Sequence, residues 1–477
     1  MDESRECPNC AEMLKRMEVL ENKLSLAFEK LYKSETRVRQ LQEALAGSAK
    51  DSTNSSKPPS SDIVKPPKKN GSGPRRRGGQ VGHPPQQRAA FRPDEIDHVQ
   101  QHAYKSCPQC GGPVDQLSTP AEVLQQAELI ERPLLITEHQ SCTCRCHACA
   151  QNFTHAIPPA IATAGTFGPR LMAHVAYLKG ACHASFRTIQ QLLQETCGLQ
   201  ISTGTLAKIC QRMACSLQPA YDELRRQIPA QTKVHIDETG HRDNGNWYWT
   251  WVFRAPSFTL FHIDRTRGAV VLDYLLGNQF RGTLQADFYG AYRRYLATHP
   301  QADAQFCHAH LVRDVKFLAT LPDEADRQFA AKLLAELKEL FRLWHAREEA
   351  ADEKTFRREL IAQGQKLEAV ALEQAPSTKA SRTLARRFRK YGDQYLRFTR
   401  VAGLEPTNNA AEQAIRQLVI DRHVTQGTRS LRGRQWCERI WSVIATCRQH
   451  GQDLLSFLEK SLLANLTDTP PPTLLPA

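Results

Sequence analysis

The stretch Lys233–Gly240, KVHIDETG, decides the fold that we expect for this chain of 477 residues. Its first residues form a short apolar run typical of a buried strand, and Asp237 stands at the end of that run. A second run, Gly282–Phe288 (GTLQADF), also predicts a strand that delivers an aspartate, Asp287. Because adjacent strands of one sheet can bring their ends together, we expect these two carboxylates to meet.

The residues around these two runs predict the rest of a sheet. Asn246–Ala255 and Phe258–Arg265 are aromatic and β-branched and are separated by turn residues, which indicates an antiparallel meander. Ala269–Leu276 predicts a crossover helix, Ala291–Ala297 a second helix, and Gln305–Ala309 a last strand. The order of elements favours a ribonuclease-H-like core, divided between residues 229–310 and 405–466, in a multidomain α/β protein.

A third carboxylate, Glu412, opens a predicted helix that Asn408 or Asn409 can cap. Arg416 lies one turn later on the same face, where it is a candidate for DNA contact. If Asp237 and Asp287 meet Glu412, their oxygens suit two Mg²⁺ or Mn²⁺ ions, which together can cleave a phosphodiester. An aspartate at a strand end is also a common turn or cap residue. Four further acidic residues therefore compete for the same role: Glu238, Asp243, Asp264 and Asp421.

The composition favours a polyanionic partner. Lys and Arg number 63 against 50 Asp and Glu, a formal net charge of +13, although a solvated basic surface would give the same balance. The chain has no long apolar run, and its start, MDESRECPNC, lacks a hydrophobic signal, so we expect a cytoplasmic protein without a membrane segment. In that compartment the 15 cysteines indicate metal binding and reduced thiols rather than disulfides.

Residues 1–46 predict a coiled coil that joins two or more chains. An amphipathic helix packed on a core is the alternative, but the sequence that follows offers little for it to pack on. The two apolar rows are Met17, Leu24, Leu31, Val38, Leu45 and Met13, Leu20, Ala27, Ser34, Leu41. Cys7 and Cys10 before the helix are either half of a zinc site or two free thiols.

Residues 47–95 form a linker rich in Pro, Ser, Gly and positive charge. Its Arg75, Arg76 and Arg77 either lie along DNA phosphates or belong to a solubilising tether.

Residues 96–160 predict a ribbon that binds a structural Zn²⁺ through two CxxC pairs. We choose Cys107, Cys110, Cys146 and Cys149 as the ligands because both pairs share the same spacing, which leaves Cys142 and Cys144 over. Residues 128–141, between the pairs, are expected to form extended hairpin strands.

Residues 161–228 predict a helical domain with a helix-turn-helix for DNA. Gly198 is the turn residue, and Ser202 or Thr203 can cap the second helix. The side chains expected to face a DNA groove are Thr203, Thr205, Lys208 and Arg212.

Residues 311–404 predict a helical insertion between the last strand and the Glu412 helix, and residues 467–477 a disordered tail. Residues 380–400 are basic and aromatic, which suits either phosphate contact or an exposed helix face. Cys307 and His310 have a CxxH spacing. This spacing indicates either a second metal site or a packed junction between a strand and a helix.

Several motifs spread over nearly the whole chain are jointly specific. They are SSKPPSSD (55–62), GGQVGHP (78–84), CPQCGG (107–112), HIDETG (235–240), ADFYGAY (286–292), CHAHLVRD (307–314) and NNAAEQAIR (408–416). With them the chain resembles the transposases of the bacterial IS66 insertion-sequence family, which belong to the DDE superfamily. The family commonly has an Asp where this chain has Thr407.

The resemblance implies that Asp237, Asp287 and Glu412 are the catalytic triad. It also implies cleavage of DNA at the transposon ends and transfer of the 3′-hydroxyl into target DNA. Helper proteins of the same element remain open as partners. Two other functions compete: a catalytically inactive, zinc-containing DNA-binding regulator derived from a transposase, and a nuclease that cuts without joining.

Overall fold

The computed structural model describes residues 8–48, 90–115, 123–130, 133–348 and 352–475. The chain divides into two units. The larger comprises Met1–Pro66, His139–Gln191 and Ile201–Ala477, and the smaller comprises Pro67–Glu138 and Leu192–Gln200.

A mixed five-stranded sheet lies at the centre of the larger unit. Its strands are β3 (Lys233–Asp243), β4 (Asn246–Arg254), β5 (Thr259–Asp264), β6 (Thr283–Ala286) and β7 (Asp303–Phe306). Their order across the sheet is β5-β4-β3-β6-β7. The first three pair antiparallel, while β6 runs parallel to β3 and β7 runs parallel to β6. The predicted meander and both later strands are therefore present, although β7 ends at Phe306 rather than at Ala309 because a helix begins at His308.

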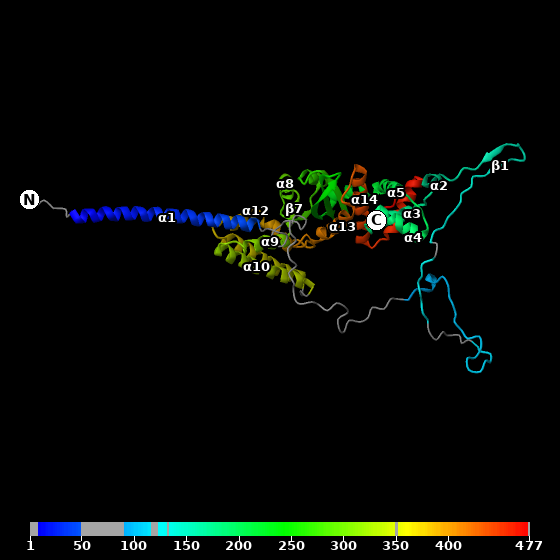
Figure 1. The fold of residues 1–477 in the computed structure, drawn as a ribbon, viewed down its shortest axis with the longest axis horizontal. Helices are drawn as coiled ribbons and strands as arrows, with labels where there is room; N and C mark the ends of the chain where they lie inside the picture. The colour runs from blue at the N-terminus through cyan, green and yellow to red at the C-terminus, as the bar shows by residue number, and fades with distance from the viewer. Residues whose placement is uncertain (1–7, 49–89, 116–122, 131–132, 349–351, 476–477) are drawn as a thin grey trace, which may run out of the picture. The chain divides into compact units, whose positions relative to one another are not determined.

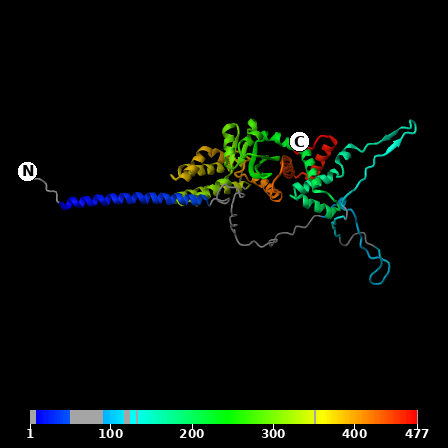
Figure 2. The same ribbon diagram turned by 45° about the horizontal axis from the view of Figure 1, so that its top comes forward.

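The sheet strands are made of side chains that are buried on both faces. Ile236 of β3 and its partner Phe253 of β4 are fully buried on one face, and His235 of β3 and Val252 of β4 are buried on the other. Sheets covered on both faces are typical of α/β proteins. Among the covering helices, α13 (Asn409–Thr425) packs on β3, α14 (Leu431–His450) on β5, and α12 (Lys379–Arg400) on β7, as Figures 1 and 2 show.

Short helices carry the chain between the later strands. Helix α7 (Val270–Leu275) and the 3₁₀ turn η4 (Gly277–Gln279) precede β6, and α8 (Gly290–Thr298) precedes β7. Helix α9 (His308–Leu318) follows β7 directly, with Cys307 as its N-cap residue. One residue thus separates the last strand from the helix, which makes this junction tight.

The helices before the sheet share a core with the end of the chain. They are α2 (Pro159–Ala164), α3 (Pro169–Gly180), α4 (Phe186–Cys197), α5 (Thr203–Ser216), α6 (Gln218–Gln227) and the 3₁₀ turn η3 (Ile228–Ala230). Helix α15 (Leu454–Thr467) packs on α2, α3 and α5, and α14 packs on α3, α5 and α6. Residues 161–228 are therefore no self-contained domain, since the apolar faces of α3 and α5 are covered by the two last helices.

The insertion after the sheet is helical, as predicted. It contains α10 (Glu324–His345), the 3₁₀ turn η5 (Ala346–Glu348), α11 (Glu353–Glu373) and α12. Helix α11 packs on both α10 and α12. The backbone of α12 departs from helical geometry at Tyr391, where the helix is kinked.

The amino-terminal part contains little sheet. Helix α1 (Pro8–Ser48) covers the predicted heptads, and a 3₁₀ turn, η2, spans Pro93–Glu95. The strands predicted at residues 128–141 are wrong where the structure describes these residues: none is assigned there. Instead β1 (Thr143–Arg145) and β2 (Asn152–Thr154) pair across the second CxxC turn.

The tail predicted to be disordered is ordered up to residue 475. Leu474 is buried, and the Thr473 hydroxyl donates a hydrogen bond to Glu223 Oε1 at 2.5 Å. The Pro-rich composition suggested disorder, but the apolar side chain of Leu474 within it packs into the core. None of the helices among the residues described is long and apolar enough to cross a membrane.

Candidate active site

Asp237 and Asp287 lie at the same level of two adjacent parallel strands, β3 and β6. The expectation that Asp237 ends its strand is wrong, because β3 continues to Asp243, whereas Asp287 directly follows β6. His235 of β3 pairs with Gln285 of β6, and each aspartate follows its strand's paired residue by two positions. Side chains alternate between the faces of a sheet, so this offset of two directs both aspartates to one face. The register thus brings two carboxyl groups from distant parts of the chain to one edge of the sheet.

Glu412 is brought to this edge by Asn408, the residue before α13. The Asn408 side-chain amide donates to the Ile236 carbonyl at 2.7 Å, and its Oδ1 lies 3.1 Å from His235 Nδ1. The expected capping bond from the Asn408 side chain is absent from the described helix start. The side chain is used for a tertiary contact instead, and that contact fixes the first turn of α13 against β3.

The charges of the three carboxyl groups act on one another. Burial raises the pKa of Asp237 well above its ordinary value, and the charges of Glu238, Asp287 and Glu412 raise it further. Burial and the charge of Glu238 raise the pKa of Asp287 to about 7. Negative charge is therefore concentrated here and is costly without a compensating cation.

The donor set fits divalent cations that prefer oxygen ligands. Among the described residues, neither aspartate forms an ion pair with Lys or Arg, and the one such contact of Glu412 is with His310 at 4.0 Å. The Glu412 Oε1 atom is buried without a hydrogen-bond partner. Among the described residues, the three carboxylates do not form a group tight enough to hold a single ion as they stand.

The four competing acidic residues have partners of their own. Glu238 accepts hydrogen bonds from Arg267 Nε at 2.7 Å and from the Tyr292 hydroxyl. The other three pair with Arg434, His262 and His183. Those pairs are Asp243–Arg434, Asp264–His262 and Asp421–His183. All four thus have partners within the described part of the protein, although Glu238 lies close enough for its charge to raise the pKa of Asp237 and Asp287.

Two arginines that the sequence did not single out lie beside the site. Arg267 stacks 3.9 Å from the Tyr289 ring and holds Glu238. Arg387 of α12 bonds to Asp314 at 2.6 Å, and its charge lowers the pKa of Asp287. Arg387 belongs to the basic segment 380–400, but nothing in the sequence told it apart from its neighbours on the exposed face of α12. Those exposed neighbours include Arg382, Arg386 and Arg389.

Each CxxC pair of the predicted zinc site forms the same turn. The Cys107 amide donates to the Gly112 carbonyl at 2.8 Å, and the Cys146 amide donates to the Gln151 carbonyl at 2.8 Å. The residue after each pair, Gly111 or Ala150, has a positive φ angle. The second cysteine's amide is the main cause that lowers the pKa of the first thiol in each pair. Each turn therefore favours thiolates, the form that binds Zn²⁺.

The two pairs lie in different units. Cys107 and Cys110 belong to the smaller unit, and Cys146 and Cys149 belong to the larger one. The unassigned Cys142 and Cys144 are exposed, and Cys144 is part of β1.

The predicted DNA-contacting residues differ in their surroundings. Thr203 and Lys208 are exposed on α5, and Ser202 caps this helix through the Thr205 amide at 3.1 Å. Arg212 is not free for a groove, since its guanidinium donates to the Ala164 carbonyl at 3.1 Å. Arg416 on α13 is exposed. The remaining three, Arg75, Arg76 and Arg77, lie outside the described residues.

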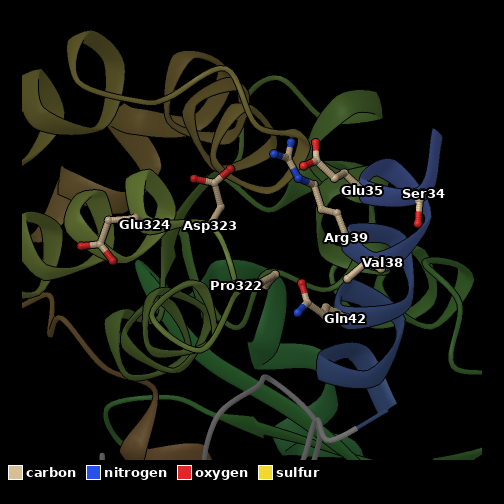
Figure 3. A pocket seen from close by; sticks show the side chains of 8 residues that line it. All are labelled: Ser34, Glu35, Val38, Arg39, Gln42, Pro322, Asp323 and Glu324. Carbon is tan, nitrogen blue, oxygen red and sulfur yellow. The ribbon is translucent and has the colours of Figure 1, made fainter. Parts of the chain in front are cut away.

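A crevice elsewhere on the larger unit contains none of these side chains. Figure 3 shows it between Ser34–Gln42 of α1 and Pro322–Glu324 at the start of α10. Its lining is mostly polar and includes neither a cysteine nor any of the three carboxylates, so it is not part of the candidate site.

Comparison with known proteins agrees with these features. Residues 8–89 match a family of unknown function, DUF6444. An uncharacterized protein of Sinorhizobium fredii, y4hP, is 27% identical over 421 residues, which cover 79% of this chain and 74% of that protein. Residues 164–435, more than half of the chain, match the model of the Transposase IS66 family. The match contains all three carboxylates of the sheet edge, and the chain belongs to the IS66 family of transposases.

Proposed function

We propose that the protein is a DDE transposase in which Asp237, Asp287 and Glu412 are the catalytic residues. The observation that carries this proposal is the parallel register that brings Asp237 and Asp287 to one face, with Glu412 anchored beside them. The strand order β5-β4-β3-β6-β7 is the one we expect of a ribonuclease-H-like core, which supports the same proposal.

The three carboxylates hold divalent cations, Mg²⁺ or Mn²⁺. When bound, such ions activate the attacking water or 3′-hydroxyl and stabilise the leaving oxygen. Asp237 and Asp287 accept backbone hydrogen bonds from Glu238 and Tyr289, at 2.8 and 2.9 Å, which orient their carboxyl groups. The side chains therefore need little rearrangement to receive the cations.

Basic side chains near the site receive the DNA backbone. Arg382, Arg386 and Arg389 are exposed on α12, and Arg416 is exposed one turn beyond Glu412. Arginine pairs with phosphate oxygens through two parallel hydrogen bonds. We assign these residues to backbone contact, and Thr203 and Lys208 on α5 to the helix-turn-helix contact with DNA.

The amino-terminal part assembles the protein on DNA. Its α1 rows join two or more chains, and Cys107, Cys110, Cys146 and Cys149 hold a structural Zn²⁺. The Zn²⁺ proposal is supported by the matching turns of the two pairs. The linker arginines Arg75, Arg76 and Arg77 follow the backbone of the bound DNA.

The test is a reaction on labelled DNA that carries the ends flanking this gene, with a target plasmid and Mg²⁺ or Mn²⁺. The proposal predicts cut ends and joined products that both depend on the cation. Cutting without joining would favour a nuclease. Tight binding of the ends without cutting, also after candidate helper proteins are added, would favour a regulator.

A further inference from the structure

Three ligand atoms of different chemistry meet on the side of Glu412 that faces α9. They are the Cys307 sulfur, a ring nitrogen of His310 and a carboxylate oxygen of Glu412, and all lie within 4.8 Å of one another. Among the residues that the structure describes, no other group of three or more His, Cys, Asp or Glu side chains meets this spacing. The tight junction between β7 and α9 creates this cluster.

Two of the atoms have no hydrogen-bond partner in the part of the chain that the structure describes. His310 Nδ1 and Glu412 Oε1 are both buried and unpaired, and they lie 4.0 Å apart. A buried polar atom left unsatisfied costs about 1–3 kcal/mol. A cation bound between these two atoms would give each of them a partner.

The third atom, Cys307 Sγ, accepts a backbone hydrogen bond. The Asn408 amide donates to Cys307 Sγ at 3.2 Å, and the amides of Ala309 and His310 also favour the thiolate form. Burial nevertheless raises the pKa of Cys307 to about 11. Amides that donate to a sulfur are the surroundings that stabilise a metal-bound thiolate.

We propose that Cys307, His310 and Glu412 bind one Zn²⁺ ion. Sulfur and imidazole ligands select zinc over Mg²⁺, which takes oxygen ligands. Zinc bonds of about 2.0–2.3 Å place tetrahedral ligands roughly 3.3–3.8 Å apart, so the ligand atoms, which lie within 4.8 Å of one another, must approach by at most about 1.5 Å. A water molecule completes the four ligands.

This ion engages the third carboxylate of the proposed active site. Zn²⁺ takes Glu412 Oε1, the buried oxygen, and thereby fixes the orientation of the side chain that the catalytic cations need. This consequence rests on the proposed function, whereas the binding of Zn²⁺ to Cys307 does not. The metal is therefore tested without DNA.

The experiment measures bound metal in the full chain. Zinc content is determined for the wild type and for Cys307→Ser, and we expect the variant to hold one Zn²⁺ fewer per chain. Co²⁺ is then titrated into a chain whose three CxxC pairs are removed by Cys7→Ser, Cys10→Ser, Cys107→Ser, Cys110→Ser, Cys146→Ser and Cys149→Ser. We expect a sulfur-to-cobalt absorption band in the near ultraviolet that saturates at one equivalent.

Further variants assign the band to the cluster. Added to that background, Cys307→Ser removes the band, and His310→Gln or Glu412→Gln weakens Co²⁺ affinity roughly tenfold or more. Cys437→Ser is the matched control, since Cys437 is another buried thiol, and it leaves the band unchanged. Circular dichroism checks that each variant is folded. Equal zinc in wild type and Cys307→Ser, or a band that survives Cys307→Ser, overturns the proposal, whether or not the protein transposes DNA.

Discussion

The sheet edge and the amino-terminal part of the chain are built in opposite ways. At the edge, each acidic side chain is fixed by buried neighbours, such as the Asn408 contact to Ile236 at 2.7 Å. In α1 the apolar rows are exposed, with Leu24 at 58% and Leu31 at 56%. The three carboxylates are thus positioned by contacts within the chain, whereas the apolar rows of α1 are left uncovered by the described residues.

The largest effect is expected where the organisation of the edge depends on one side chain. Asn408→Ala removes the contacts to Ile236 and His235 and frees the first turn of α13. A displacement of about 1 Å at a catalytic group costs on the order of 100-fold in rate. We predict this loss in cation-dependent DNA cleavage. Asn409→Ala is the control, because Asn409 is exposed; equal losses in both variants would contradict the anchoring role.

A second prediction concerns the free energy of unfolding that is lost when several ionised carboxylates lie close together. In the folded protein the pKa of Asp287 is raised from 3.8 to about 7. The protonated form therefore favours folding. This stability is full below pH 4 and is lost as the pH rises through about 7. At pH 8 without metal, Asp287→Asn should raise the free energy of unfolding by on the order of 2–4 kcal/mol.

This gain is measured by urea unfolding in the presence of a chelator. It should vanish near pH 4, and Mg²⁺ should stabilise the wild type but not the variant. Asp264→Asn provides the opposite sign, because hydrogen bonding to His262 lowers the pKa of Asp264. If Asp287→Asn instead lowered the free energy of unfolding at pH 8, the ionised Asp287 carboxylate would not destabilise the folded protein, and the prediction would be wrong.

The zinc turns should give a local effect. Cys107→Ser with Cys110→Ser is expected to remove the Zn²⁺ bound by the two CxxC pairs and to leave the unfolding of the sheet unchanged. Elemental analysis and thermal unfolding measure the two properties. Cys142→Ser with Cys144→Ser serves as the control and should retain the zinc. Undiminished zinc after loss of Cys107 and Cys110 would refute the assignment.

The smallest effect on the core is expected from α1. Leu24→Asp with Leu31→Asp should convert the assembly to single chains, because both side chains lie in one row of the heptads. Leu26→Asp, equally exposed at 53% but outside both rows, should keep the assembly. Light scattering gives the mass in solution. A wild-type protein that is already a single chain would refute the coiled coil.

The sequence predicted the sheet edge well because its signals are local. The strand residues before Asp237 and Asp287 can be read directly, although β3 continues past Asp237 to Asp243. The parallel register adds that both aspartates fall at one level. The role of Asn408 could not be read, since its local capping tendency gave way to a contact with Ile236, 172 positions away. Arg212 likewise turned inward to Ala164, a partner that only the packing of α2 and α5 provides.

Weak packing explains the errors in the amino-terminal part. The apolar residues at 128–141 resemble strands, yet exposed side chains such as Leu135 have no sheet to join among the described residues. The short strands form instead where β1 and β2 flank the second CxxC turn. Where few side chains are buried, the local sequence pattern does not determine which residues pair as strands.

The central claim is that Asp237, Asp287 and Glu412 act together in DNA cleavage. The most direct test is the rate of cleavage of labelled transposon ends by Asp237→Asn, Asp287→Asn and Glu412→Gln, with Asp264→Asn as the control. We predict that the first three bind the ends but cleave at least about 10³-fold more slowly, while the control stays within a few-fold of the wild type. Near-wild-type cleavage by any of the three would contradict the claim.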